Sequence, residues 1–214
     1  MTGKGECMFR LYGFFTQNTM KTLYVLEAVA ADYEYEFVNL GEREQRRKQF
    51  LQMNPVGKVP VLEHDGEYLF ESGAICRYVA NVLDSPLYPA DKLARARVDQ
   101  WMDFFTCHLG RWFTNLFYEN VIKPKFNLGG PDEDSVAEAL KFAHQQLGML
   151  DELLATTDWL ANDAMSIADL FAYAYVEQYR AIDFSMDDYP NVIAWFNRLD
   201  ALDCVAAARA RIPS

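Results

Sequence analysis

Residues 54–80, NPVGKVPVLEHDGEYLFESGAICRYVA, determine how the first part of the chain is expected to fold. Two short apolar runs, 59–63 and 68–70, are separated by a connection that contains Asp65-Gly66. Asp-Gly between two such runs favours a tight turn joining antiparallel strands. Residues 72–83 then have the pattern of a helix. The stretch therefore predicts a β-hairpin followed by a helix.

The residues that precede this stretch supply two more strands and two more helices. Runs 10–15 and 33–39 are short, aromatic-rich and alternating, which is typical of strands. Residues 19–31 place apolar side chains on one helical face, and the charged stretch 42–52 also favours a helix. The predicted order for residues 1–84 is therefore βαβαββα, a small α+β domain.

Beyond residue 84 the pattern is helical throughout. Two prolines within Ser85-Pro86-Leu87-Tyr88-Pro89 suit neither a helix nor a central strand, so this segment is interpreted as a linker. Apolar stripes at helical spacing then run over residues 98–116 and 136–154, and Ser135-x-x-Glu138 is interpreted as a capping box. Two further helices are expected to begin at Ser166 and Pro190. Residues 85–214 are thus predicted to form an all-helical bundle.

The composition excludes several classes of partner. The formal net charge of -11 disfavours nucleic acid and anionic membranes, and no apolar run reaches the ~18 residues of a membrane span. The start of the chain has no apolar signal-peptide region. Four scattered cysteines are typical of free thiols in a reducing compartment, so a cytoplasmic location is expected. The three histidines are also scattered, and no metal site is predicted.

Three local features have both a structural and a ligand-binding interpretation. Thr16-Gln17-Asn18-Thr19 suits the start of a helix, and its hydroxyl and amide groups also suit an anion such as a thiolate. In the second feature, a cis Val59-Pro60 bond would turn the main chain of Val59 toward a bound peptide, and Lys58 would add a cation. Glu71-Ser72, at a predicted helix start, suits the ammonium and carboxylate of an amino-acid headgroup.

A fourth feature is interpreted as structural. Ser166-Ile167-Ala168-Asp169-Leu170 has the form of a capping box with Asp in the return position. It is expected to nucleate a buried helix and to carry no chemistry.

Together these features resemble the cytosolic glutathione transferase family over essentially the whole chain. The stretches that carry the resemblance are LYGFFTQNTMKTLYVLEA (11–28), residues 54–80, RARVDQW (95–101) and SIADL (166–170), and they look closest to the theta, phi and bacterial nu classes. The resemblance implies a thioredoxin-like N-terminal domain that binds glutathione, an all-α C-terminal domain, and a homodimer.

The resemblance also assigns roles to individual residues. Thr16 and Asn18 are implied to activate the thiol, and Val59 before a cis Pro60 is implied to hold the cysteinyl backbone. Glu71 and Ser72 would bind the γ-glutamyl end. Lys58 would reach the glycine carboxylate, with Gln45 and Arg46 as weaker candidates. Thr stands where theta and phi enzymes have Ser, and residues 14–20 contain no Cys, which argues against the beta and omega chemistries.

The predicted function is a detoxifying transferase in which a glutathione thiolate attacks a small apolar electrophile. Phe14, Phe15, Cys107 and Arg111 are the predicted residues of the electrophile pocket, while Trp112 is expected in the bundle core. Two alternatives stay open. One is a glutathione-dependent disulfide reductase or peroxidase that uses no protein cysteine, and the other is a non-catalytic binding module with the same fold.

Overall fold

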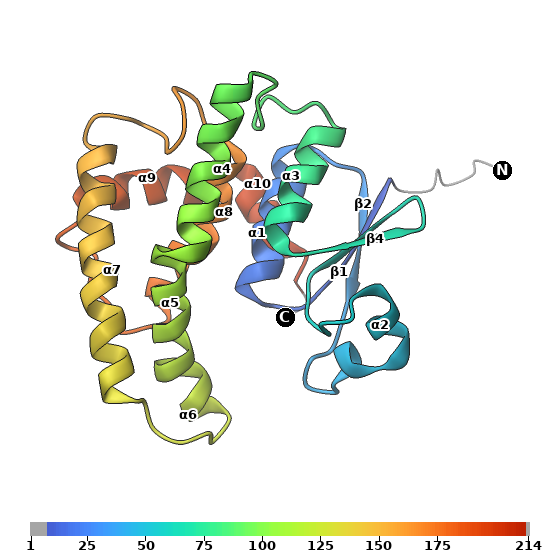
Figure 1. Cartoon of the computed structure of the whole chain (residues 1–214), viewed down its shortest axis with the longest axis horizontal. Helices are drawn as coiled ribbons and strands as arrows, with labels where there is room; N and C mark the ends of the chain where they lie inside the picture. The colour runs from blue at the N-terminus through green and yellow to red at the C-terminus, as the bar shows by residue number, and fades with distance from the viewer. Residues whose placement is uncertain (1–7, 213–214) are drawn as a thin grey trace. The chain divides into compact units, whose positions relative to one another are not determined.

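The computed structural model describes residues 8–212 (Figure 1). Contacts within the chain divide it into two compact units. The first unit contains the chain up to Tyr88 and again from Leu202 onward, and the second unit is Pro89–Ala201. The boundary predicted between residues 84 and 85 lies a few residues before the first division. The return of the chain to the first unit at Leu202 differs from the predicted 85–214 domain.

The first unit is built on a four-stranded mixed sheet, so the predicted α+β thioredoxin-like class and the order of its strands and helices along the chain are confirmed. The strands are β1 (Phe9–Gly13), β2 (Tyr33–Phe37), β3 (Val61–His64) and β4 (Glu67–Phe70). Their order across the sheet is β2-β1-β3-β4, with β1 and β2 parallel and the other pairs antiparallel. Asp65 and Gly66 both have positive φ, 52° and 78°, as the tight β3–β4 turn requires.

Helices cover both faces of this sheet: α1 (Gln17–Ala28), α2 (Lys48–Met53) and α3 (Ser72–Val82). Tyr12 pairs with Val61 across β1 and β3, and Val61 shares a buried cluster with Phe50 of α2. Successive side chains of a strand point to opposite faces. The fully buried neighbours Leu11 and Leu62 therefore point to the other face, where α1 packs against α3.

The charged stretch 42–52 is not one helix. A 3-10 turn, Glu44–Arg46, precedes α2, and Arg47 between them is extended with φ -68° and ψ 146°. The 3-10 turn is preceded by Arg43 in the left-handed region, with φ 58°. The chain thus bends twice within a stretch whose composition alone favours a continuous helix.

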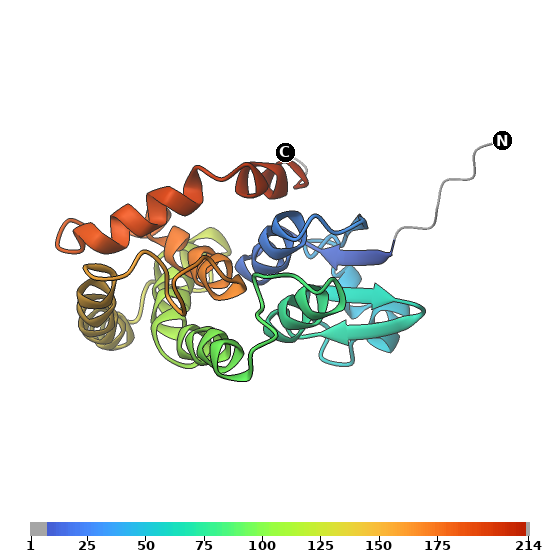
Figure 2. The same cartoon turned by 90° about the horizontal axis from the view of Figure 1, so that it is seen from above.

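The C-terminal helix α10 (Asp203–Ala210) packs on α1 within the first unit (Figure 2). Just after it, Arg211 Nε donates to Glu27 Oε1 of α1 at 2.8 Å. The Arg211 guanidinium also lies over the ring of Tyr33, 4.9 Å from its centroid. This ion pair and the cation–π contact fix the end of the described chain beside α1 and β2.

The second unit is all-helical, as predicted. Its helices are α4 (Lys92–Cys107), α5 (Leu109–Phe117), α6 (Lys123–Lys125), α7 (Glu133–Leu154), α8 (Ile167–Val176) and α9 (Pro190–Asp200), with a π-helical turn at Tyr118–Ile122 and a 3-10 turn at Glu177–Arg180. All ten residues of α8 are buried, and α8 contacts α4, α5 and α9. This helix forms the centre of the unit.

The apolar stripe over 98–116 is interrupted between α4 and α5. His108 has φ -122° and ψ -98°, which is not helical. A Cβ added at Gly110 would lie 2.2 Å from the Phe105 carbonyl oxygen and 2.5 Å from the Tyr175 ring of α8. The glycine therefore allows α5 to approach α8 closely.

The capping predictions had mixed outcomes. Ser166 and Asp169 form the predicted capping box at α8. Pro190 opens α9, also as predicted. The predicted box at Ser135 is wrong, because Asp132 is the N-cap of α7 and accepts a bond from the Ser135 N–H at 2.8 Å.

Within residues 8–212, each helix is too short or too polar to cross a membrane. Over the same residues, no three His, Cys, Asp or Glu side chains lie together as metal ligands would. Cys76, Cys107 and Cys204 are free thiols.

Candidate functional site

A shallow hollow of about 60 Å³ on the first unit brings together three segments that are distant in sequence. They are the start of α1, the loop that precedes β3, and the corner between β4 and α3. The lining residues are Asn18, Asn54, Val56, Lys58, Val59, Pro60, Glu71 and Ser72. Six of the residues predicted to bind or activate glutathione are among them.

The loop that enters β3 presents main-chain groups to the hollow. The Val59-Pro60 peptide bond is cis. Neither the N–H nor the C=O of Val59 has a hydrogen-bond partner among residues 8–212. Asn54 is only 2% exposed and braces the loop, since its Nδ2 donates to the Lys58 carbonyl at 2.7 Å and its Oδ1 accepts from the Val56 N–H at 3.0 Å. The loop is thus fixed with one donor and one acceptor available to a ligand.

The 3-10 turn at Glu44–Arg46 lies against this loop. Gly57 has φ +65°, and a Cβ there would lie 2.9 Å from Arg46 Nη1 and 3.0 Å from the Gln45 carbonyl oxygen. Arg46 Nη1 donates to the Val56 carbonyl at 3.4 Å. The buried Gln45 Oε1 has no hydrogen-bond partner in the described residues. Gln45 and Arg46 are therefore near Lys58, as their predicted shared role requires.

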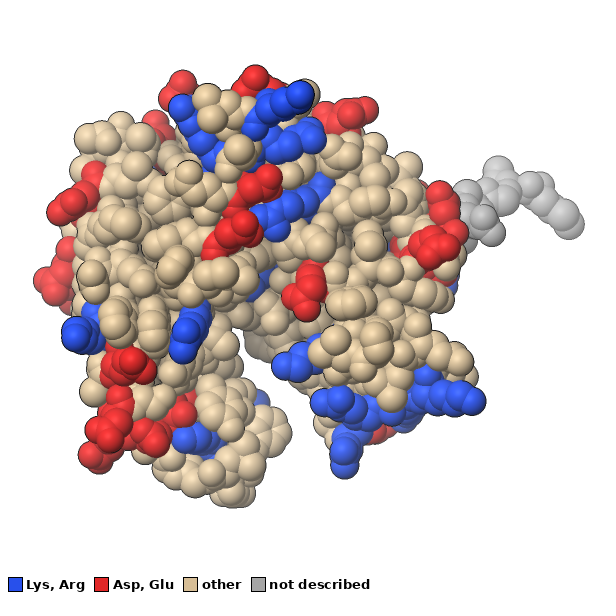
Figure 3. Space-filling view, viewed as in Figure 1, with Lys and Arg blue, Asp and Glu red and all other residues tan. Residues whose placement is uncertain are grey.

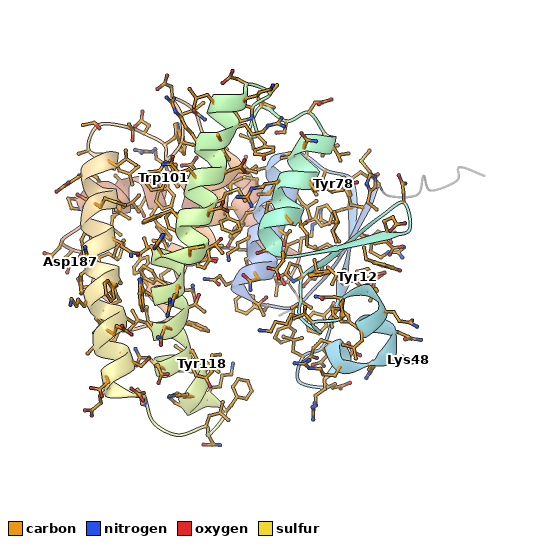
Figure 4. The ribbon with its side chains drawn as sticks, viewed as in Figure 1. Tyr12, Lys48, Tyr78, Trp101, Tyr118 and Asp187 are labelled. Carbon is orange, nitrogen blue, oxygen red and sulfur yellow. The ribbon has the colours of Figure 1, made fainter. Side chains whose placement is uncertain are left out.

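Cationic side chains gather around α2 and this turn (Figure 3). They are the exposed residues Arg43, Arg46, Arg47, Lys48 and Lys58. Lys48, labelled in Figure 4, stands at the start of α2. Arg47 is partly neutralised by Glu44, whose Oε1 lies 2.9 Å from its Nη1. On a chain with a net charge of -11, this edge is a local patch of positive charge.

The corner between β4 and α3 places the carboxylate of Glu71 beside the partly positive N-terminus of α3. Ser72 is the first residue of α3, and no side chain caps this helix. The Ser72 hydroxyl has no hydrogen-bond partner among the described residues, and a helix N-terminus attracts carboxylates. The exposed Glu71 has φ 71°, a strained conformation for a residue with a side chain. The corner thus offers an acceptor for an ammonium and donors for a carboxylate.

The start of α1 combines a structural cap with the exposed side-chain amide of Asn18. Thr16 is the N-cap, and its Oγ1 accepts from the Thr19 N–H at 3.3 Å. The two hydroxyl oxygens of Thr16 and Thr19 are 3.1 Å apart, and the Phe14 N–H donates to Thr19 Oγ1 at 3.4 Å. If Thr19 donates to Thr16, the proton of Thr16 is available to a ligand. The exposed Asn18 lines the hollow directly.

Two known protein domain families match most of the chain. The family described as "Glutathione S-transferase, N-terminal domain" matches residues 8–81, and "Glutathione S-transferase, C-terminal domain" matches residues 108–203. Glutathione S-transferase hmp2 of Hypomyces subiculosus is 32% identical over 209 residues, which is 95% of this chain and 98% of that protein. The chain belongs to the glutathione S-transferase family.

Further similarities extend this result. A solved glutathione S-transferase-I bound to lactoylglutathione is 28% identical, with a TM-score of 0.87 over 95% of this chain and 99% of its own. Elongation factor 1-gamma of Prunus avium is 33% identical over 165 residues, which is 72% of this chain and 36% of that factor. The predicted family and enzyme class, a glutathione transferase, are thereby confirmed.

In this glutathione transferase the predicted electrophile-pocket residues fall in both units. Phe14 is half-buried against Phe37, with ring centroids 5.3 Å apart, while Phe15 is 67% exposed in the first unit. Cys107 and Arg111 are exposed in the second unit. The pocket stays a prediction. Trp112 is buried and stacks on Phe142 at 4.8 Å, which is the bundle-core position that the sequence analysis favoured.

Sequence reasoning gave no role in the transferase site to Asn54 or to Lys21. Asn54 orders the loop through two side-chain bonds, and Lys21 lies buried beneath Asn18. An Asn that precedes a proline-containing loop is a signal that was available for the first residue. The second has no such local signal, because a lysine in an amphipathic helix normally faces solvent.

Proposed function

We propose that this transferase binds glutathione in the hollow of its first unit and activates the thiol for attack on a small apolar electrophile. The observation that carries this proposal is the convergence of three segments, each of which offers groups complementary to a different part of the tripeptide. The family membership supports the choice of glutathione as the ligand.

In this proposal each part of the ligand has its own partner. The main chain of Val59 pairs with the cysteinyl unit as an added strand would. Ser72 and the α3 N-terminus bind the γ-glutamyl carboxylate, and Glu71 accepts from its ammonium. The glycine carboxylate is held by Lys58, with Gln45 and Arg46 beside it.

Thiol activation is assigned to Thr16 and Asn18. A free thiol has a pKa of about 8.5, and lowering it by two units requires about 2.7 kcal/mol of thiolate stabilisation. Hydrogen bonds from Thr16 and Asn18, with the N-terminus of α1, are of the strength required. The thiol proton passes to solvent. The thiolate then forms a carbon–sulfur bond with the electrophile, which expels its leaving group, and Phe14, Phe15, Cys107 and Arg111 contact the electrophile.

The biological setting is proposed from the family resemblance and the charge. We expect a cytoplasmic homodimer that acts in detoxification without a metal. The net charge of -11 disfavours nucleic acid and anionic membranes as partners.

Isothermal titration calorimetry with glutathione tests the binding half of this proposal. Saturable heat from a single site per chain is expected. If neither glutathione nor its oxidised form produces such heat, the proposal is wrong and a non-catalytic module of this fold becomes the better description.

Replacing Thr16 with valine tests the activation half. We expect Thr16→Val to lower turnover at neutral pH by about 10- to 100-fold, because one charge-assisted bond to sulfur is lost. Loss of that donor raises the thiol pKa, so the pH–rate profile should shift to higher pH and activity should partly recover there. The glutathione Kd should change little. Thr16→Ser, which keeps both the hydroxyl and the helix cap, is the control. Wild-type turnover in Thr16→Val would remove Thr16 from the mechanism.

A second candidate function is favoured by Asn18, which lines the hollow where Thr16 does not. Thr16 and Asn18 together form a Thr-x-Asn pair, which resembles that of nu-class proteins that reduce disulfides. Two glutathiones would then reduce a mixed disulfide to two thiols and leave as oxidised glutathione. Assays with a mixed disulfide and with a chlorinated aromatic distinguish the two reactions, and activity on the aromatic alone rejects disulfide reduction.

A further inference from the structure

Lys21 is a buried lysine in the middle of α1. It is 1% exposed, although lysine is almost never fully buried in proteins. The Cys76 Sγ of α3 donates to the Lys21 carbonyl at 3.5 Å, so the residue lies where α1 packs on α3. Burial lowers the pKa of Lys21 well below its usual value, and the nearby Cys76 and Glu71 act in the opposite direction. Burying a lysine amino group costs free energy, so a specific role for Lys21 is expected.

The Lys21 amino group contacts Asn18 directly. Its Nζ donates to Asn18 Oδ1 at 2.8 Å, one helical turn toward the hollow. A lysine Nζ carries N–H donors whether or not it is protonated, and an amide offers an acceptor only at its oxygen. The oxygen of Asn18 is therefore the atom that faces inward to Lys21.

The orientation of the amide follows from this contact. With Oδ1 turned inward, the Nδ2 group with its two donors is left on the exposed side of Asn18, which lines the hollow. Without a partner, an exposed asparagine amide rotates freely and presents its oxygen as readily as its nitrogen. An oxygen beside a thiolate would repel it.

We infer that Lys21 is a positioning residue, which holds the amide of Asn18 so that its Nδ2 donates to the sulfur of bound glutathione. The inference rests on the proposed function. The hydrogen bond from Lys21 also polarises the amide and makes Nδ2 a stronger donor. Lys21 acts only through Asn18 and does not contact the ligand.

The test is a double-mutant cycle with the full-length protein: wild type, Asn18→Ala, Lys21→Met and the double variant. For each, the pKa of the bound glutathione thiol is measured from the ultraviolet absorbance of the thiolate against pH. The glutathione Kd and thermal midpoint are recorded in parallel. Asn18→Ala is expected to raise the thiol pKa by about one unit. Lys21→Met should raise it nearly as far, and the double variant no further.

Two results would overturn the inference. One is a Lys21→Met protein whose bound thiol keeps the wild-type pKa while Asn18→Ala raises it. The other is a double variant whose shift is the sum of the single shifts, since Lys21 would then act independently of Asn18. If the role of Lys21 is purely structural, Lys21→Met changes the thermal midpoint but does not raise the thiol pKa as Asn18→Ala does. Failure of the wild type to bind glutathione would instead contradict the proposed function.

Lys21→Gln is the conservative variant and keeps side-chain N–H donors without a buried charge. It should restore most of the wild-type thiol pKa, and a shift as large as that of Asn18→Ala contradicts the inference. One measurement needs no Lys21 variant. The NMR signals of the Asn18 side-chain amide, assigned by their loss in Asn18→Ala, should shift strongly with glutathione and less with S-methylglutathione. Equal shifts with the two ligands would contradict a bond to the thiolate.

Discussion

Glu71→Gln is expected to weaken glutathione binding by about 10- to 100-fold, since a hydrogen bond between charged groups contributes about 1.5–3 kcal/mol. The glutamine has nearly the same shape, so the strained backbone at φ 71° and the start of α3 are retained. What is lost is the negative charge that we propose faces the ligand ammonium. Isothermal titration calorimetry gives the Kd directly.

Glu67→Gln is the matched control for this experiment. Glu67 is an exposed carboxylate at the start of β4, four positions before Glu71, and does not line the hollow. Its substitution should leave the Kd within a factor of about two, as expected for a surface change away from the site. Because Glu71 also lies in the electrostatic environment of Lys21, the thermal midpoint of each variant is measured as well. A Glu71→Gln Kd equal to that of Glu67→Gln would contradict the assignment of the γ-glutamyl site.

Asp169→Ala should lower the free energy of unfolding of the second unit by about 3–5 kcal/mol, because four buried donors lose their acceptor and each unsatisfied donor costs about 1 kcal/mol or more. Asp169 is fully buried and accepts four hydrogen bonds. The donors are the Ser166 N–H and hydroxyl, at 2.9 and 3.0 Å, and the Leu160 N–H and Trp195 Nε1, both at 3.0 Å. Alanine leaves all four donors buried without an acceptor.

Tryptophan fluorescence during urea unfolding measures this effect selectively. All four tryptophans of the chain, Trp101, Trp112, Trp159 and Trp195, belong to the second unit. Asp163→Ala is the control, because Asp163 is an exposed carboxylate only six positions away and should change stability by no more than about 0.5 kcal/mol. Equal urea midpoints for the two variants would show that the Asp169 network does not stabilise the unit.

The sequence predicts the fold best where the signal is local. The Asp65-Gly66 turn and the box from Ser166 to Asp169 depend on a few neighbouring residues, and both were found. The break at His108 was missed because the apolar stripe continues through it. Next to this break Gly110 lies close to Tyr175, a contact between residues that are distant in sequence. Helix α10 was missed for a similar reason, since a short alanine-rich segment gains its stability by packing on α1.

The candidate site shows the same division. Val59, Glu71 and Ser72 could be named from the sequence, because their motif is contiguous and their spacing is characteristic. Lys21 could not be given a role, since its burial exists only once α3 covers α1. The electrophile-pocket residues Phe14, Phe15, Cys107 and Arg111 stay a prediction, because residue order does not fix which side chains face a common space.

The position of α10 has a consequence for synthesis on the ribosome. The first unit is discontinuous, and Arg211, which pairs with Glu27 and covers Tyr33, is translated after the whole of the second unit. During synthesis, one flank of α1 therefore stays uncovered until the entire helical unit has been translated. A fragment that stops at residue 88 would keep every residue that lines the hollow and would still expose that flank of α1, so chaperones are expected to bind it.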